Sequence, residues 1–193
     1  MKPQFQYQRT LIRMIRSLCG NRRKLYIAEI GVWNGETSEV LLARFPKIHL
    51  TMVDSWKAIP HSASWKERWD RLTKKSQKVF ENAFITTLDR TRFANGRFKI
   101  VRDFSVAAAK KLRRSHFDLV FIDAGHDYFS VKSDITAWYP LVKIGGILCG
   151  HDYGSRFFLG VKKAVKEWAL SYGYESGLKV HVGRIWSIRK KKT

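Results

Sequence analysis

Several features that would decide a protein's class are scarce or missing in this chain of 193 residues. The two cysteines, Cys19 and Cys149, lie far apart and form neither a metal-type nor a redox-type pair. This excludes a disulfide scaffold and predicts a reduced, cytoplasmic setting. No apolar run reaches the about 18 residues that a membrane span needs. Arg13 and Arg16 also interrupt the apolar centre that a secretory signal would require.

Acidic residues are scarce too, and this gives the chain an unusual charge. Sixteen Asp and Glu stand against 37 Lys and Arg, for a formal net charge of +21. Such a charge attracts anions, whether nucleic acid, phosphorylated small molecules or acidic lipid. Many of the cations, however, stand at helical spacing among apolar residues, as in "VKKAVKEW", which is typical of solvated helix faces. Composition therefore leaves open whether the charge serves a polyanionic partner.

Apolar runs bounded by turn residues recur along the chain and predict seven strands. The runs are "KLYIAEIG", "IHLTMVD", "FKIVRD", "FDLVFID", "GGILCG", "LKVHVG" and "RIWSIR". Segments of helical period separate the first five, which predicts a mostly parallel sheet with helices on both faces. No helical segment separates the last two, so we expect them to form an antiparallel hairpin. A further helix is expected within 64–84, and Gly20 is expected to end an N-terminal helix.

The first loop after a strand, in "YIAEIGVWNGETS", has the glycine-rich character of a nucleotide cradle. Its spacing, Glu-x-Gly-x-x-x-Gly, is neither the dinucleotide fingerprint nor that of a phosphate loop. Glu29 and Glu36 flank it, and such acids suit a ligand with positive charge. Asp54 ends the next strand, where a carboxylate can accept hydrogen bonds from two ribose hydroxyls. A cationic ligand that carries a ribose indicates S-adenosylmethionine.

This loop is the first of an ordered set of segments, which continues with "TMVDSW", "VRDFSVAA", "FDLVFIDAGHDY" and "GGILCGHDYG". The set resembles the class I S-adenosylmethionine-dependent methyltransferases, and most closely the small bacterial O-methyltransferases that act on sugars and small molecules. The resemblance covers roughly 25–189. It implies a Rossmann-like, doubly wound α/β sheet of seven strands. The sequence has no Pro- or Ser-rich linker and no low-complexity tract, so we expect a single domain over 1–193, with an N-terminal helix or lid in 1–24, a catalytic core in 25–189 and a basic tail in 190–193.

The resemblance also implies which residues hold the donor. Glu29 and the two glycines of the loop would line its methionine end, Asp54 would hold the ribose, and the segment after the third strand would meet the adenine. As alternatives, Gly35 would serve only a turn, and Asp103 would only cap the following helix. The complete predicted donor set is Glu29, Gly31, Gly35, Asp54, Ser55, Asp103, Phe104, Ser105 and Asp123.

The tetrapeptide Gly-His-Asp-Tyr occurs twice, at 125–128 and 150–153, each time after a predicted strand. Neighbouring parallel strands end at one edge of a sheet, so we expect the two copies to face each other across a cleft. The predicted catalytic residues there are Asp123, His126, His151 and Asp152. Either histidine suits a general base, whereas Asp123 and Asp152 suit a divalent cation such as Mg²⁺. A histidine at position 151 departs from the acidic pair of metal-dependent relatives, so a softer ion or no metal stays open.

The acceptor and the roles of several nearby residues also stay open. The leading prediction is O-methylation of a hydroxyl on a sugar, a glycan precursor or a small metabolite that could be anionic. RNA methylation and an inactive donor-binding protein are the alternatives, and a homo-oligomer is not excluded. Trp33, Trp56 and Trp65 are candidates for lining the acceptor pocket, and Trp186 is expected in the core. Three further residues are expected to pack or to cap a helix: Asp127, Tyr128 and Tyr153.

Overall fold

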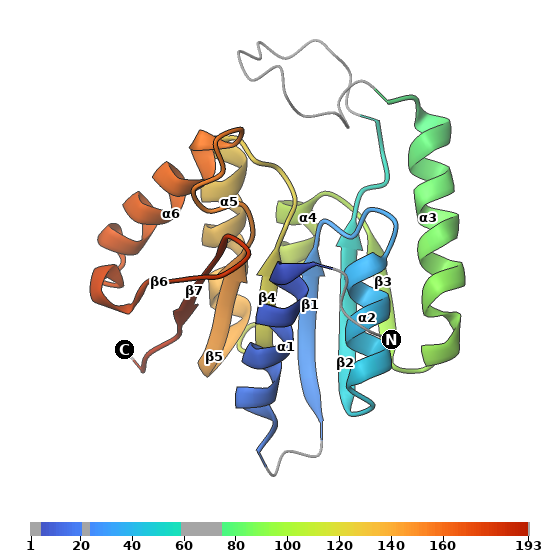
Figure 1. The fold of residues 1–193 in the computed structure, drawn as a ribbon, viewed down its shortest axis with the longest axis horizontal. Coiled ribbons are helices and arrows are strands. Elements are labelled where there is room, and N and C mark those ends of the chain that lie inside the picture. Colours follow the sequence, from blue (N-terminus) through green and yellow to red (C-terminus); the bar gives the residue numbers. More distant parts are fainter. Residues whose placement is uncertain (1–4, 21–23, 59–74, 193) are drawn as a thin grey trace.

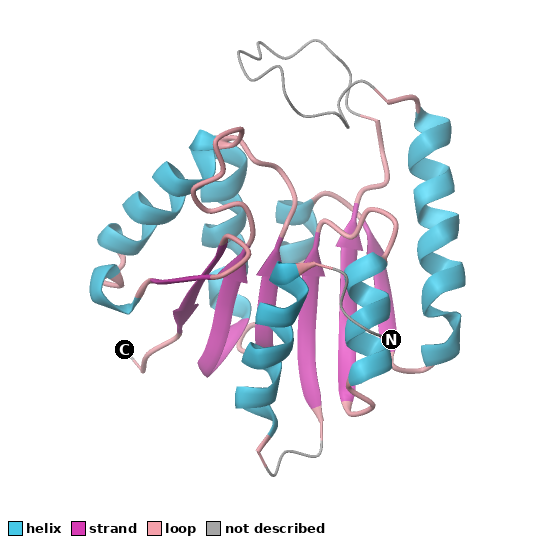
Figure 2. Cartoon of the chain, viewed as in Figure 1, coloured by secondary structure: helices cyan, strands magenta, loops and turns pink. Residues whose placement is uncertain are grey.

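The computed structural model describes residues 5–20, 24–58 and 75–192, and its centre is a seven-stranded sheet (Figures 1 and 2). The strands are β1 (Leu25–Ile30), β2 (Ile48–Asp54), β3 (Phe98–Arg102), β4 (Phe117–Ile122), β5 (Val142–Gly150), β6 (Lys179–His181) and β7 (Ile185–Arg189). Their order across the sheet is β3-β2-β1-β4-β5-β7-β6. The first five strands are parallel, and β7 is antiparallel to both β5 and β6. The predicted mixed sheet and its final hairpin are confirmed.

Helices connect the strands and cover both faces of the sheet. They are α1 (Gln6–Cys19), α2 (Glu36–Arg44), α3 (Gln77–Thr91), α4 (Ser105–Lys110), α5 (Tyr128–Trp138) and α6 (Leu159–Ser171). Short 3₁₀ turns follow at η1 (Arg92–Ala94), η2 (Tyr139–Leu141) and η3 (Glu175–Gly177). The doubly wound architecture that the sequence predicted is therefore present.

Alternating side chains of each strand build two separate cores. Ile27 and Leu119 point to the face that α1, α2 and α3 cover, whereas Ala28 and Val120 point to the face of α4, α5 and α6. Because successive side chains of a strand point to opposite faces, a strand buried on both sides must be apolar throughout. Only this arrangement explains why "FDLVFI" has no polar alternation apart from Asp118, which is paired with Lys143.

The expected additional helix ends later than predicted. Residues 59–74 lie outside the described residues, and α3 runs from Gln77 to Thr91, so it extends seven residues past the predicted end at Phe84. Residues 85–91 include Ile85, Thr86 and Thr87, which are β-branched and lower helix propensity. Packing overrides this preference, because Ala83 and Thr87 are buried against the neighbouring loop and helix.

Helix α1 ends at Cys19, and Gly20 with a φ of 35° follows it, as predicted. Leu11 and Ile15 are fully buried against the sheet, so α1 is an integral part of one core. Its first turn carries Tyr7 toward the edge at which the parallel strands end, where the ring lies 4.6 Å from that of His151. A role as a lid stays a prediction. Within the described residues, none of the helices has the length and apolarity needed to cross a bilayer.

Candidate active site

The two Gly-His-Asp-Tyr copies meet at the carboxyl ends of two neighbouring strands. In the register of β4 and β5, Ile122 lies beside Gly150. Asp123 and His151 each come one residue later, so they leave the sheet side by side, and the His151 N–H donates to the Ile122 carbonyl at 3.0 Å. The two copies therefore meet, as expected from the order of the strands, because the pairing of β4 with β5 brings their last residues side by side.

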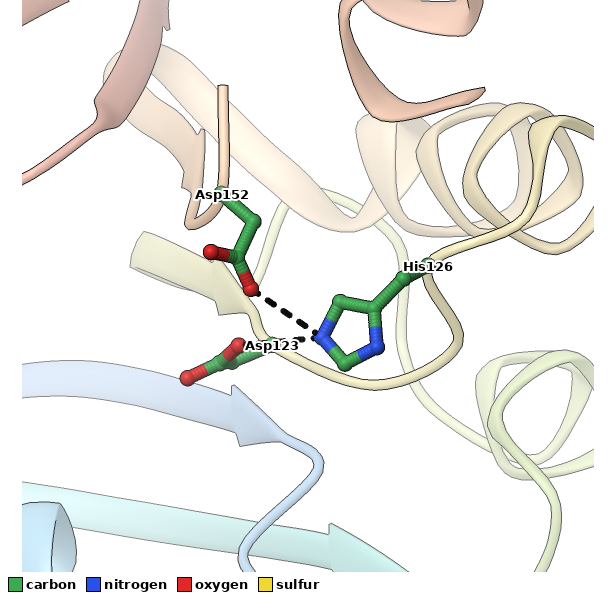
Figure 3. A group of neighbouring side chains, drawn as sticks. All are labelled: Asp123, His126 and Asp152. Atoms are coloured by element: carbon green, nitrogen blue, oxygen red, sulfur yellow. Dashed lines mark ion pairs between the residues drawn. The ribbon is translucent and has the colours of Figure 1, made fainter. Parts of the chain in front are cut away.

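Four side chains from these loops form a compact polar cluster, and Figure 3 shows three of them, Asp123, His126 and Asp152. The Nε2 atom of His126 lies 3.3 Å from an Asp152 carboxylate oxygen and 3.8 Å from one of Asp123. The Nδ1 atom of His151 lies 3.4 Å from Asp123 and 3.5 Å from Asp152. Each carboxylate thus faces both imidazoles. We define these four residues, Asp123, His126, His151 and Asp152, as the catalytic cluster.

The two copies of the tetrapeptide have different roles. In the first copy, Asp127 is the N-cap of α5 and accepts hydrogen bonds from the Phe129 and Ser130 N–H groups, as one of the predictions had it. This leaves His126 to turn inward, where its ring stacks on Phe158 at 4.1 Å. In the second copy, Asp152 adopts a left-handed φ of 58° and is nearly buried. That backbone conformation, uncommon outside glycine, directs its carboxylate into the cluster.

Opposite charges inside the cluster determine how it holds protons. Burial would raise the pKa of Asp123, but hydrogen bonds and charge from His126 and His151 outweigh it and lower the pKa to about 2. Burial alone would lower the pKa of His151, whereas its hydrogen bond with Asp123 and the charges of Asp123 and Asp152 raise it overall. Asp123 is therefore ionised across the physiological range, and the cluster is built to stabilise positive charge.

A cavity of about 360 Å³ lies beside the cluster, over the ends of the parallel strands. Asp123 lines it, so the cluster and the cavity share one wall. Of the nine predicted donor-binding residues, seven line the cavity: Gly31, Asp54, Ser55, Asp103, Phe104, Ser105 and Asp123. The other two, Glu29 and Gly35, lie outside the lining.

Glu29 and Gly35 support the cavity from behind. Glu29 is buried and accepts a hydrogen bond from Ser38, and burial raises its pKa to about 8. Gly35 precedes α2 with a φ of 79°, and a β-carbon there would lie 3.1 Å from Thr87 of α3. Glu29 is thus buried and does not line the cavity. Its contact with the donor's amino group stays a prediction.

Asp54 holds the first loop in shape. One carboxylate oxygen accepts hydrogen bonds from the Val32 N–H at 3.0 Å and the Trp33 N–H at 2.9 Å. The other accepts from the Trp56 N–H at 2.8 Å. Each carboxylate oxygen has two lone pairs, so the second oxygen keeps an acceptor site for a ligand hydroxyl. At the end of β3, Asp103 accepts from the Phe104 N–H and pairs with Lys111.

Gly31 is required where the first loop passes the end of β4. Its φ is 85°, and a β-carbon would lie 2.0 Å from the Asp123 carbonyl oxygen. We expect Gly31→Ala to lower the melting temperature strongly, because the clash adds to a left-handed strain of about 1–2 kcal/mol. The matched control is Gly96→Ala, with a φ of 79° and open space around the β-carbon. Similar melting temperatures for the two variants would contradict this close approach.

The predicted tryptophans divide between cavity and core. Trp33 lines the cavity and packs edge-on against Phe80 at 5.6 Å. The expectation for Trp56 was wrong: it is fully buried, and its indole N–H donates to the Trp33 carbonyl at 2.7 Å. Trp65 lies outside the described residues. Trp186 is in the core, as predicted, and its indole lies against Gly150, where a β-carbon would be 2.6 Å from it.

Sequence reasoning missed three residues around the site. Tyr7 covers His151 from α1, and Arg184 in the β6–β7 turn lies 3.6 Å from an Asp152 oxygen. Asp134 on α5 lines the cavity, is nearly buried, and has a pKa that burial raises to about 6. Tyr7 and Arg184 are distant in sequence and belong to no local pattern. Asp134 could have been found from the sequence, because it is a single acid on the apolar face of the helix expected in "VKSDITAWYPLV".

The comparisons with known proteins agree with this geometry. A family model described as a methyltransferase domain matches residues 28–153, more than half of the chain. The chain belongs to this methyltransferase family. In this class I S-adenosylmethionine-dependent methyltransferase, the cavity and the four-residue cluster lie at the carboxyl ends of the strands, where a doubly wound fold places its ligands. No curated protein sequence matches this methyltransferase.

Solved structures share the fold of the methyltransferase at low sequence identity. The O-methyltransferase NovP superposes with a TM-score of 0.70 and 16% identity, over 96% of this chain and 80% of that one. CalS11, a TDP-rhamnose 3'-O-methyltransferase of calicheamicin biosynthesis, has a TM-score of 0.60 and 14% identity, over 95% and 78%. MycE, in complex with Mg, SAH and mycinamycin VI, has a TM-score of 0.61 and 17% identity, over 100% of this chain but 51% of that one.

Proposed function

We propose that this methyltransferase transfers a methyl group to a hydroxyl of a sugar, a glycan precursor or a similar small metabolite, with a divalent cation bound by the catalytic cluster. The observation that carries the proposal is the position of Asp123, which lines the donor cavity and lies within the cluster. A methyl group carried in that cavity would then face an acceptor held at the cluster. Two of the structural neighbours, NovP and CalS11, are O-methyltransferases, and CalS11 acts on a TDP-sugar.

Methyl transfer from a sulfonium is an in-line displacement by the acceptor. The donor is already activated, so the enzyme has to align the acceptor and make its oxygen nucleophilic. A sugar hydroxyl has a high pKa, so a base must remove its proton or a cation must make the hydroxyl more acidic. His151 faces two carboxylates that stabilise its protonated form, which suits it to receive this proton.

The residues of the cluster fit a divalent ion. One ligand atom each from Asp123, His126 and Asp152 lie within 4.8 Å of one another, close enough for one ion to contact all three. Two carboxylates suit Mg²⁺, and the imidazole extends the choice to ions such as Mn²⁺ or Zn²⁺. When bound, such an ion would acidify and orient the acceptor hydroxyl. The MycE methyltransferase, whose structure has a similar fold, was solved in complex with Mg.

Surroundings of the cluster favour a polar and anionic acceptor. Arg184 is 56% exposed beside Asp152 and can meet a phosphate or a carboxylate at the mouth of the site. Phe158, which stacks on His126, offers an apolar surface next to it. We also propose a cytoplasmic location, because both cysteines are free thiols and Cys149 is buried in the core.

A methyl-release assay tests this function. We expect methyl transfer from S-adenosylmethionine to at least one member of a panel of sugars, sugar nucleotides and phenolic metabolites. Chelator is expected to abolish the activity, and Mg²⁺, Mn²⁺ or Zn²⁺ to restore it. Full activity in chelator would assign the chemistry to a histidine base instead. Transfer to RNA alone, with no small acceptor methylated, would contradict the proposal.

A further inference from the structure

The opposite end of the sheet, where the parallel strands begin, carries a concentration of positive charge. Lys24 precedes β1, Lys47 precedes β2, Arg97 precedes β3, Arg113 and Arg114 precede β4, and Lys143 is the second residue of β5. Figure 1 shows the beginnings of the parallel strands at the end of the sheet opposite the arrowheads. We define these six residues, Lys24, Lys47, Arg97, Arg113, Arg114 and Lys143, as the basal face.

Acidic residues are missing from the same connections. Within the described parts of the segments that lead into β1 to β5, residues 24, 45–47, 92–97, 111–116 and 139–141, there is no Asp or Glu. The nearest acid of the sheet, Asp118, is buried and already paired with Lys143 at 2.8 Å. Asp89, at the end of α3, pairs with Arg92 at 3.2 Å. Among the described residues, the cations of the basal face other than Lys143 therefore have no neighbouring carboxylate that neutralises them.

Three aromatic rings lie between these cations. The ring of Tyr26 lies 5.5 Å from that of His49 and 4.6 Å from that of His116. The Lys143 ammonium lies 5.2 Å from the Tyr26 ring centre. All three rings are partly exposed. The register places them together, because Tyr26 and His49 are partners in β1 and β2 and His116 directly precedes β4.

Burial and the nearby positive charges lower the pKa of both histidines. Burial lowers the pKa of His49, and Lys24 and Arg97 lower it further. Burial also lowers the pKa of His116, with Lys143 and Arg113 adding to the effect and Asp118 opposing it. Both rings are therefore neutral near pH 7, which suits them to stack rather than to add charge.

We propose that the basal face binds the backbone of a single nucleic-acid strand, with its cations on the phosphates and with Tyr26, His49 and His116 as a stacking surface for bases. Neighbouring strands of a sheet lie about 4.8 Å apart, so the connections into five strands form a row about 19 Å long. A linear row of cations with aromatic rings between them is the arrangement that proteins use for single strands. An acidic lipid surface would use the charge but not the rings.

The position of the face makes this a docking function and not a second acceptor site. Strands of six residues separate it from the catalytic cluster by about 20 Å. The nucleotides that lie on this face are therefore too far from the methyl donor of the same molecule to be its acceptor. The inference is thus independent of the acceptor proposed above, and it assigns a partner to six of the 37 Lys and Arg residues.

Fluorescence anisotropy with a labelled RNA 20-mer of mixed sequence tests the proposal. We expect binding that weakens with KCl, and a loss of at least about tenfold in the triple variant Lys24→Glu, Lys47→Glu, Arg113→Glu at 100 mM KCl. Three lost phosphate contacts should also reduce the salt slope by about 2. The control variant Arg13→Glu, Lys162→Glu, Lys166→Glu has the same change of charge on exposed positions of α1 and α6, and should bind within about threefold of wild type.

Equal losses in the two triple variants would overturn the proposal in favour of diffuse charge attraction. Lack of RNA binding by the wild type, or binding only to phosphatidylserine vesicles, would also overturn it. If the glutamate variant does not fold by circular dichroism, its Lys24→Gln, Lys47→Gln, Arg113→Gln counterpart takes its place. His116→Ala should weaken binding about fivefold or more without a change in salt slope. Methyl transfer to a small acceptor should be the same in all basal variants.

Discussion

Asp152→Asn is expected to lower the rate of methyl transfer by at least about 100-fold while donor binding changes little. Asp152 faces His126, His151 and Arg184, so the loss of its charge affects both the proposed ion and the proposed base. Loss of one such group in an active site commonly costs about 10²–10³ in rate. Asp152 does not line the donor cavity, and asparagine tolerates its left-handed φ of 58°. Rates with an acceptor from the panel and calorimetry with S-adenosylhomocysteine separate the two effects.

The other copy of the tetrapeptide supplies the matched control for this variant. Asp127 has the same neighbours in sequence, but its carboxylate caps α5, and asparagine is about as good an N-cap. Asp127→Asn should therefore keep methyl transfer within a fewfold of wild type. Equal rates for Asp152→Asn and wild type would remove Asp152 from the catalytic cluster. Equal losses in both variants would mean that the two copies have one common role.

Asp54→Ala is expected to weaken donor binding by at least about 100-fold. A hydrogen bond to a charged group contributes about 1.5–3 kcal/mol, and one oxygen of Asp54 keeps an acceptor site for a ribose hydroxyl. The variant also removes the acceptor for the Val32, Trp33 and Trp56 N–H groups, so the first loop loses its anchor. Calorimetry with S-adenosylmethionine gives the loss directly.

The ligand separates the two roles of Asp54. Wild type should bind adenosine more tightly than 2'-deoxyadenosine, and this preference should vanish in Asp54→Ala if the carboxylate contacts the ribose. A preference that survives in the variant would leave Asp54 as a loop anchor only. Ser55→Ala, next to it on the cavity wall, changes another predicted donor-binding side chain but leaves the three N–H contacts of Asp54 in place, so the ribose preference should persist in it.

Most of the fold could be predicted because its signals are local. The strand "IHLTMVD" was predicted with the bounds that β2 has, since a buried parallel strand is an unbroken apolar run between turn residues. Helix α3 was placed less well, because its β-branched residues oppose a helix locally while tertiary burial favours one. For the same reason the sequence did not show that Trp56 is buried under the first loop.

The sequence by itself determined that the glycine loop, Asp54, Asp103 and Asp123 share one edge of the sheet. Alternating strands and helices of right-handed connection leave no other edge for residues that follow parallel strands. Only the tertiary structure decided which side chains turn toward one another there. The cap at Asp127 and the left-handed φ of Asp152 direct the two copies of Gly-His-Asp-Tyr differently. The packing of α1 adds Tyr7 from far away in the sequence, because side-chain direction depends on backbone dihedrals and contacts that no local pattern records.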